Sequence, residues 1–173
     1  MIRAALLGVA VCALFSSGCG TKTVTRTRTV TVTATGKVGA GPPGRHVEFG
    51  YIKALTRDGQ RYRMRFDPAW MLSGETANVA AAHDGAVEPG EPVPNDNYVI
   101  DEGKRLLTYF VSPDARVTVL KSGPDGSRVS VAALARLVSG RGAPFKPWEP
   151  LTTGFWIVVN IDTVRALDQQ YRP

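Results

Sequence analysis

The chain has 173 residues, of which 43% are hydrophobic and 21% are charged, and its formal net charge is +6. The excess charge lies in the first 45 residues, which hold six basic residues and no acidic one, whereas residues 46–173 carry 15 basic and 15 acidic side chains. Nucleic-acid binding needs a basic surface. Because residues 46–173 carry no net charge, we expect no nucleic acid among the partners.

Residues 1–18 have the layout of a bacterial signal peptide. Arg3 supplies a positive charge, an apolar run extends from Ala4 to Phe15, and small residues precede Cys19. An apolar run this short cannot span a bilayer, which takes about 20 apolar residues. The segment Ser16-Ser17-Gly18-Cys19 resembles the lipobox of bacterial lipoproteins, although Ser16 stands where that family prefers leucine.

The lipoprotein resemblance implies that the signal peptide is removed and that Cys19 becomes the lipidated first residue. The mature chain would then be held in the cell envelope, on the extracytoplasmic face of the membrane. Two alternatives stay open: ordinary secretion after cleavage near Gly18, and an uncleaved anchor. Because Cys12 lies in the removed segment, no disulfide or free thiol is expected in the mature chain, and a zinc site would lack ligands.

Residues 19–45 form a segment of low complexity. Threonine occupies every second position from Thr21 to Thr35, and glycines and Pro42-Pro43 follow. The alternation is strand-like, but there is little apolar mass to bury, so we predict a disordered tether. The composition resembles the threonine-rich stalks of actinobacterial surface lipoproteins. Alternatively, its basic groups could contact anionic lipid headgroups and its threonines could carry sugars.

A hairpin is predicted at the start of the single globular domain, residues 46–173. Its strands are Val47–Leu55 and Arg61–Phe66, joined around Asp58-Gly59, a dipeptide that favours tight turns. With Asp58 and Gly59 as the two turn residues, Leu55 faces Tyr62 and Tyr51 faces Phe66. Asp67-Pro68 then predicts the end of the strand and the start of a short helical turn through Trp70 and Leu72.

The remaining elements follow from turn residues and apolar spacing. We predict a helix from Ser73 through Ala82, a loop over residues 89–97, strands at 98–100, 106–111 and 116–120, a helix from a Ser130 cap to Gly140, and a strand at 155–159. Residues 163–171 fit either a returning strand, which we favour, or a helix. The fold class is α+β and β-rich: a small curved antiparallel sheet or partly open barrel, OB-like, with two short helices.

A second resemblance covers most of residues 46–173. Phe66-Asp67-Pro68-Ala69, residues 93–100, Phe155-Trp156-Ile157 and Gln170-Tyr171 look like a family of uncharacterised secreted bacterial domains. That resemblance supports the domain boundaries and implies no activity. The chain also lacks a phosphate-binding glycine loop, a serine nucleophile elbow and metal-ligand histidine spacing. We therefore expect no catalytic residue, metal or cofactor.

One set of polar residues is a candidate binding or catalytic site. It consists of Asp67, Asp96 and Asp101, with Asn95 and Asn97. Aspartate and asparagine commonly gather at turns because their side chains bond the local backbone. The same residues could instead supply oxygens to a cation such as calcium or form a catalytic pair. Turn formation is the interpretation that we favour.

Arg61, Arg63 and Arg65 project from one face of the second strand and could bind an acidic partner. The alternative is a solvated face with carboxylates opposite. The aromatic residues Trp70, Tyr98, Trp148 and Trp156 could line a groove or pack in the core, and Trp148 is the most exposed candidate. We expect a non-catalytic domain that binds an envelope protein or cell-wall polymer; the alternatives are a hydrolase using Asp67 or Asp96 and a structural spacer. The oligomeric state is left open.

Overall fold

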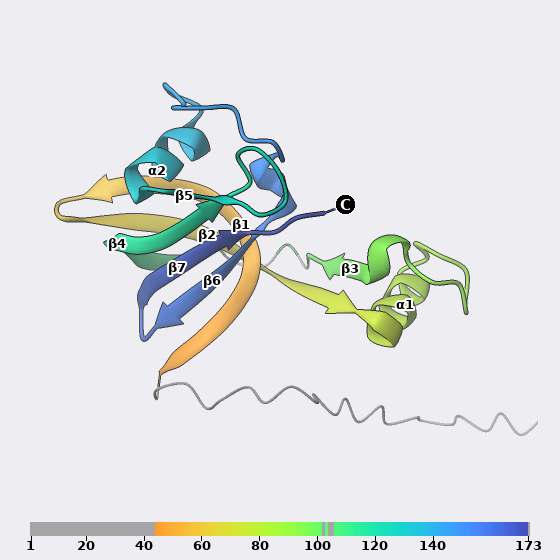
Figure 1. Ribbon diagram of the computed structural model, residues 1–173. Helices are drawn as coiled ribbons and strands as arrows, with labels where there is room; N and C mark the ends of the chain where they lie inside the picture. Colours follow the sequence, from red (N-terminus) through yellow and green to blue (C-terminus); the bar gives the residue numbers. More distant parts are fainter. Residues whose placement is uncertain (1–43, 102, 104–105, 173) are drawn as a thin grey trace, which may run out of the picture. The chain divides into compact units, whose positions relative to one another are not determined.

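Seven strands and two α-helices make up the part of the chain that this computed structural model describes, residues 44–101, 103 and 106–172 (Figure 1). In chain order they are β1 (Arg45–Asp58), β2 (Arg61–Ser73), α1 (Gly74–His83), the 3-10 turn η1 (Pro94–Asp96), β3 (Asn97–Ile100), β4 (Leu107–Val119), β5 (Ser127–Val129), α2 (Val131–Ser139), the 3-10 turn η2 (Leu151–Thr153), β6 (Phe155–Asn160) and β7 (Thr163–Gln169). The signal peptide, Cys19 and most of the tether lie outside the described residues.

Five of the strands close into a barrel. β1 pairs with β2, β2 with β4, β4 with β7, β7 with β6, and β6 returns to β1. Four of these ladders are antiparallel, and the β4–β7 ladder is parallel. Closure removes the free edges of the sheet. The β-rich, barrel-like fold class with two short helices is therefore confirmed, with a mixed and closed sheet in place of an antiparallel or partly open one.

The order of strands in the barrel is OB-like. Numbered within the barrel alone, the strands run 1-2-3-5-4 and back to 1, the third and fifth are parallel, and α2 lies between the third and fourth. β3 and β5 lie outside the closed ring, each paired with one barrel strand. The two strands at the centre of the usual OB binding face are thus β2 and β4.

The β1–β2 hairpin forms, but its turn lies one residue later than predicted. Asp58 pairs with Arg61, so the turn residues are Gly59 and Gln60. Gly59 has φ 61°, a conformation that glycine adopts without steric cost and that suits the first position of a tight hairpin turn. Asp58 is therefore the last residue of β1 and can reach a side chain on β2.

The later turn changes which residues face each other across the hairpin. Leu55 lies opposite Met64 instead of Tyr62, and Phe66 lies opposite Ile52 instead of Tyr51. The ladder is interrupted between Ile52 and Ala54, so Lys53 forms the bulge. A bulge inserts one residue and corrects the inward and outward alternation. Leu55 and Ile52 can then both face the barrel interior.

The predicted helical turn after Asp67 is absent, because β2 continues as a strand through Ser73. The β2–β4 ladder ends at Phe66 and the β2–β3 ladder begins at Trp70. Pro68 therefore lies where β2 has a partner strand only on its β1 side. A proline lacks a backbone N–H and is tolerated in a strand where no ladder bond is lost.

The second half of the chain largely follows the predicted pattern. The two strands predicted at 106–111 and 116–120 are parts of one long strand, β4 (Leu107–Val119), whose pairing with β7 shifts between Val111 and Arg116. β5 was not predicted. The returning strand is confirmed as β7. Helix α2 is also confirmed, with the Ser130 hydroxyl accepting a hydrogen bond from the Ala133 N–H at 3.2 Å and Gly140 ending the helix at φ 66°.

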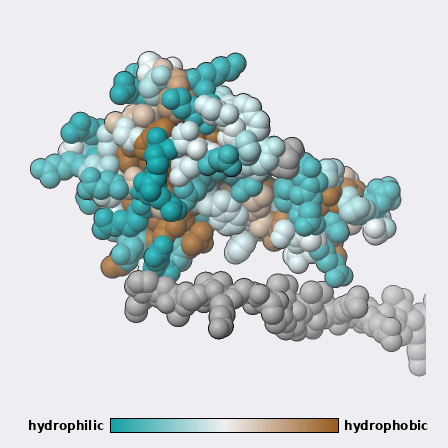
Figure 2. Space-filling view, in the orientation of Figure 1, coloured by the Kyte–Doolittle hydropathy of each residue, from teal (hydrophilic) through white to brown (hydrophobic). Residues whose placement is uncertain are grey.

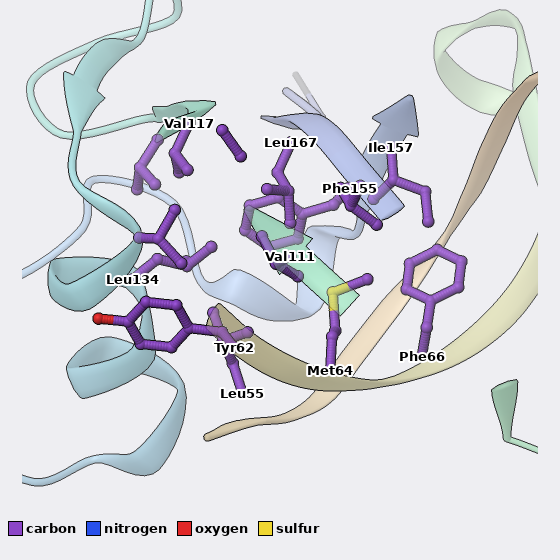
Figure 3. Close-up of a cluster of buried hydrophobic side chains, with 14 of the residues drawn as sticks. Leu55, Tyr62, Met64, Phe66, Val111, Val117, Leu134, Phe155, Ile157 and Leu167 are labelled. Carbon is purple, nitrogen blue, oxygen red and sulfur yellow. The ribbon is translucent and has the colours of Figure 1, made fainter. Parts of the chain in front are cut away.

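The main core fills the barrel interior and continues under α2. Figure 3 shows side chains from the β1–β2 hairpin, β4, β6 and β7 converging with Leu134 of α2. Phe66, Phe155 and Met64 are the largest fully buried members. α2 packs against β1 and β4, so its apolar face extends the barrel core.

The segment 70–100 leaves the barrel and is called here the outer arm. It comprises the far part of β2, α1, η1 and β3 (Figure 1). Its own core is small: Ala77, Ala81 and Val93 are buried, and Leu72, Val87 and Tyr98 pack around them. The Val93 N–H donates a hydrogen bond to the side-chain oxygen of Asn78 at 2.8 Å, which ties the loop to α1.

Candidate functional site

The three arginines singled out from the sequence lie on the outer surface of β2. Arg61, Arg63 and Arg65 are exposed, and they alternate with buried residues that point into the barrel. Across the ladder, Arg63 faces Phe110 of β4, and Arg65 faces Thr108. We call this surface, Arg61, Arg63, Arg65, Thr108 and Phe110, the arginine face.

The contacts of the three guanidinium groups differ. The Arg61 guanidinium carbon lies 3.3 Å from the centroid of the Phe110 ring. Arg63 forms an ion pair with Asp58 at 2.8 Å, between half-exposed side chains. In the described part of the chain, neither Arg61 nor Arg65 is ion-paired. If this surface were only a solvated face, we would expect a carboxylate opposite each arginine. Only Arg63 has one among the described residues.

Two loops border the arginine face. The Gly59-Gln60 turn joins β1 to β2, and the turn at Ile161 and Asp162 joins β6 to β7. The Asp162 carbonyl accepts a hydrogen bond from the Phe110 N–H at 3.1 Å, which fixes the second loop beside β4. OB barrels bind extended polymers across the equivalent strands and loops. The arginine face thus occupies the position at which this architecture presents ligands.

Trp148, the other predicted binding residue, is not part of the arginine face. Its ring stacks on Tyr171 with a centroid separation of 5.5 Å, and the backbone N–H of Trp148 donates to the Leu120 carbonyl at 2.7 Å. Leu120 follows the C-terminal end of β4, whereas Phe110 lies near the start of that strand. The Trp148 side chain is half exposed, but Trp70 is more exposed, at 63% against 48%, so the prediction that Trp148 is the most exposed of the four aromatic residues is wrong.

Trp70 and Trp156 line an apolar cavity of about 340 Å³, called here the crevice. Its lining residues are Val47, Glu48, Phe49, Pro68, Ala69, Trp70, Met71, Leu107 and Trp156. The crevice forms where β1 and β2 diverge, because their ladder ends at Phe49 and Ala69. Its volume lies near the lower end of the range for ligand pockets. Two of the four aromatic residues considered from the sequence therefore line a groove, while Tyr98 packs against the small core of the outer arm.

Glu48 joins two other polar side chains beside the crevice. The Tyr109 hydroxyl lies 2.9 and 3.0 Å from the two Glu48 carboxylate oxygens, and His46 Nε2 lies 2.9 Å from Oε1. Burial, and then the hydrogen bond to Glu48, raise the pKa of Tyr109 above its usual range. Sequence reasoning missed this cluster. The alternation His46-x-Glu48 would have placed both side chains on one face of a strand, but nothing in the sequence pointed to Tyr109.

The candidate carboxylates are distributed over different elements. Asp67 is buried on β2 and pairs with Lys53 Nζ at 2.9 Å, and its Oδ1 has no hydrogen-bond partner among the described residues. The hydrogen bond to Asp67 is the main cause of a raised pKa at Lys53, to which the charge of Asp101 also contributes. Asp96 lies in η1, in the outer arm. Asp67 and Asp101 thus influence the same lysine, while Asp96 belongs to another element.

The Asn95 to Asn97 run behaves as a turn. Asn95 and Asp96 have positive φ angles of 59° and 53°, and the Asn97 side-chain amide donates to the Asn95 carbonyl at 2.7 Å. Over residues 44–101, 103 and 106–172, no group of three or more histidine, cysteine, aspartate or glutamate side chains is arranged to hold a metal ion. The local bonding agrees with the turn interpretation of this run.

Within the same ranges, no helix has the length and apolar character needed to cross a bilayer. Comparison of the chain with models of known families, with curated proteins and with solved structures gives no significant match.

Proposed function

We propose that this chain is an envelope lipoprotein whose domain of residues 46–173 binds an acidic protein or cell-wall component without catalysis. The observation that carries the proposal is the arginine face. Two exposed arginines, Arg61 and Arg65, have no described ion-pair partner on the strands where an OB-like barrel presents ligands. Guanidinium groups bind carboxylate and phosphate oxygens through paired hydrogen bonds.

The shape of the face suits an extended partner. Alternate residues on a strand are separated by roughly 7 Å, so the three arginines form a row along β2. Phe110 adds an aromatic surface beside that row, and Arg61 already covers its ring. A linear acidic polymer or acidic peptide segment could contact the row at several points. A single small anion would use one arginine.

The binding test compares two triple variants that remove equal charge. We expect Arg61→Ser, Arg63→Ser and Arg65→Ser together to weaken capture of the partner by crosslinking on intact cells about tenfold and to flatten its salt dependence. The control variant replaces Arg128, Arg136 and Arg141, which are exposed on β5, α2 and the following loop. Equal capture by the wild type and the arginine-face variant would refute this binding surface.

The proposed membrane anchor rests on the lipobox resemblance at Cys19. We expect Cys19→Ala to abolish incorporation of radiolabelled fatty acid and to release the protein or leave it unprocessed. Cys12→Ala is the matched control, because Cys12 lies inside the proposed signal peptide and should leave labelling unchanged. Retention of the label by Cys19→Ala would show that the lipid is attached elsewhere.

The alternative from another class, a hydrolase using Asp67 or Asp96, has less support. The two carboxylates lie on separate elements, and Asp67 is buried and paired with Lys53. A structural spacer, the third possibility, would not need exposed arginines without ion-pair partners. The partner-capture comparison distinguishes a spacer from a binding domain directly.

A further inference from the structure

The crevice lies between two strand edges that have no partner strand in the described ranges. Beyond the pair Phe49 and Ala69, β1 continues with β6 alone, and β2 continues with β3 alone. In the described part of the chain, residues 45–48 of β1 therefore have no strand on the side that faces β2. An unpaired edge presents backbone N–H and C=O groups that an added strand can use.

Exposed apolar side chains are concentrated in the walls of the crevice. Six large apolar residues are exposed among the described residues, and three of them, Val47, Trp70 and Leu107, line this cavity. On the face shown in Figure 2, hydrophilic residues cover most of the barrel, with apolar residues in smaller patches. Gathered exposed apolar side chains are typical of interaction sites.

Among the described residues that line the crevice, Glu48 is the only charged one. Of the residues that the structure describes, Tyr109 and His46 both contact Oε1 of Glu48, and Tyr109 alone contacts Oε2. An ionised carboxylate has about four acceptor positions, so Oε2 can accept a further hydrogen bond. A ligand with a basic side chain would therefore complement the charge of Glu48. Its apolar groups would pack against the apolar walls of the crevice.

We infer that the crevice binds an extended peptide segment of a partner protein, which adds as a strand along β1 and places a basic side chain at Glu48 between two apolar side chains. The alternation follows from β1 itself, because Glu48 projects to one side of the strand and Val47 and Phe49 project to the other. In strand addition, backbone bonds supply affinity and alternate side chains supply specificity. The site is separate from the arginine face and does not rest on it.

The test uses fluorescently labelled seven-residue peptides and the full chain. One peptide has lysine at its centre with valine on each side, and two matched peptides have norleucine or glutamate at the centre. We expect the lysine peptide to bind about tenfold more tightly than the norleucine peptide, as for a hydrogen bond to a charged group, and the glutamate peptide to bind weakest. Equal binding of the three peptides, or no binding of any, would overturn the inference.

A variant of the protein tests the contribution of the Glu48 charge. Glu48→Gln keeps the shape of the side chain and should reduce the preference for lysine over norleucine to less than about twofold. A preference that is unchanged in Glu48→Gln would show that the basic residue is recognised elsewhere. The arginine-face triple variant should bind the lysine peptide as the wild type does, which separates this site from the proposed function.

Two further comparisons test the apolar contact and the strand addition. Val47→Ser should weaken every peptide, whereas Val79→Ser on α1 should not; the two valines are 59% and 60% exposed, respectively. A lysine peptide with alternate backbone amides methylated should lose binding at least tenfold, because it cannot form the edge bonds. Undiminished binding of the methylated peptide to the wild type would favour a small apolar amine as the true ligand and refute strand addition.

Discussion

The barrel and the outer arm share strand β2, yet they are stabilised differently. A cluster of 16 buried residues fills the barrel and extends under α2, and five ladders join the barrel strands, so each of these strands has two neighbours. The outer arm has three buried residues, two of them alanines, and one ladder of four residue pairs. Local stability follows buried apolar area and protected backbone bonds. We therefore expect the arm to open without unfolding the barrel.

The largest expected effect is on the barrel core. Phe155→Ala removes a fully buried ring and should lower the free energy of unfolding by about 3–5 kcal/mol in urea denaturation. The matched change in the arm, Val93→Ala, should lower it by less than about 1 kcal/mol, because the arm can open separately. Similar losses for both variants would mean that the two regions unfold together.

A second variant tests the packing of Phe49 against the backbone of Gly154 on the outer side of the barrel. Gly154 has φ 95° and ψ 173°, and a Cβ there would lie 2.5 Å from Cζ of Phe49. Gly154→Ala should therefore cost roughly 2–4 kcal/mol from backbone strain and overlap. Gly59→Ala is the control: it also has a positive φ, but a Cβ there would meet open space, so about 1–2 kcal/mol is expected. Equal losses in thermal denaturation would contradict this packing.

The hydrogen bond between α1 and Val93 should control opening of the arm. Asn78→Ala removes the acceptor of a partly buried bond, so we expect about 1–3 kcal/mol of lost local stability. Hydrogen exchange should become faster in α1 and β3 and remain unchanged in β4 and β7. Asn97→Ala, which removes an exposed bond within a turn, should change exchange little. Faster exchange throughout the barrel would show that the arm supports it.

The smallest effect concerns pH. The pKa of Tyr109 is raised in the folded protein, mainly by burial and then by its hydrogen bond to Glu48. The folded state keeps this proton when the unfolded state loses it near pH 10, so the stabilisation is complete below about pH 10 and is lost as the pH rises further. Tyr109→Phe should flatten that loss in denaturation measured at several alkaline pH values.

The same substitution in the outer arm provides the comparison. The pKa of Tyr98 is also raised, by burial and by a hydrogen bond to Asp84 at 3.2 Å. Tyr98→Phe should affect global unfolding less than Tyr109→Phe does, because the arm opens separately. A larger alkaline effect at Tyr98 would place the arm inside the cooperative unit.

Local patterns in the sequence predicted most elements but not their pairing. Helix α2 followed from a serine cap, apolar spacing and a final glycine, all within eleven residues. The hairpin turn was placed one residue too early, which moves the partner of Leu55 by two residues, because Asp-Gly can place its glycine at either turn position. Pro68 suggested a helix start, and only the absence of a partner strand on one side makes it acceptable in β2.

The candidate surfaces show the same limit. Strict alternation placed Arg61, Arg63 and Arg65 on one exposed face, as the structure has them. The Phe110 ring under Arg61 depends on the β2–β4 pairing, which brings together residues almost 50 positions apart. The bond between Glu48 and Tyr109 spans 61 positions. Pairings of such separation follow from closure of the barrel and leave no local signal in a single sequence.

The parallel ladder between β4 and β7 has a consequence for how the chain acquires its structure. β7 is the last of the described strands, and it fills the place between β4 and β6. During synthesis from the N-terminus, β4 and β6 each keep one unpaired edge until residues 163–169 have been made. Contacts between distant parts of a chain slow folding. The barrel therefore cannot close until nearly all of the described residues have been made.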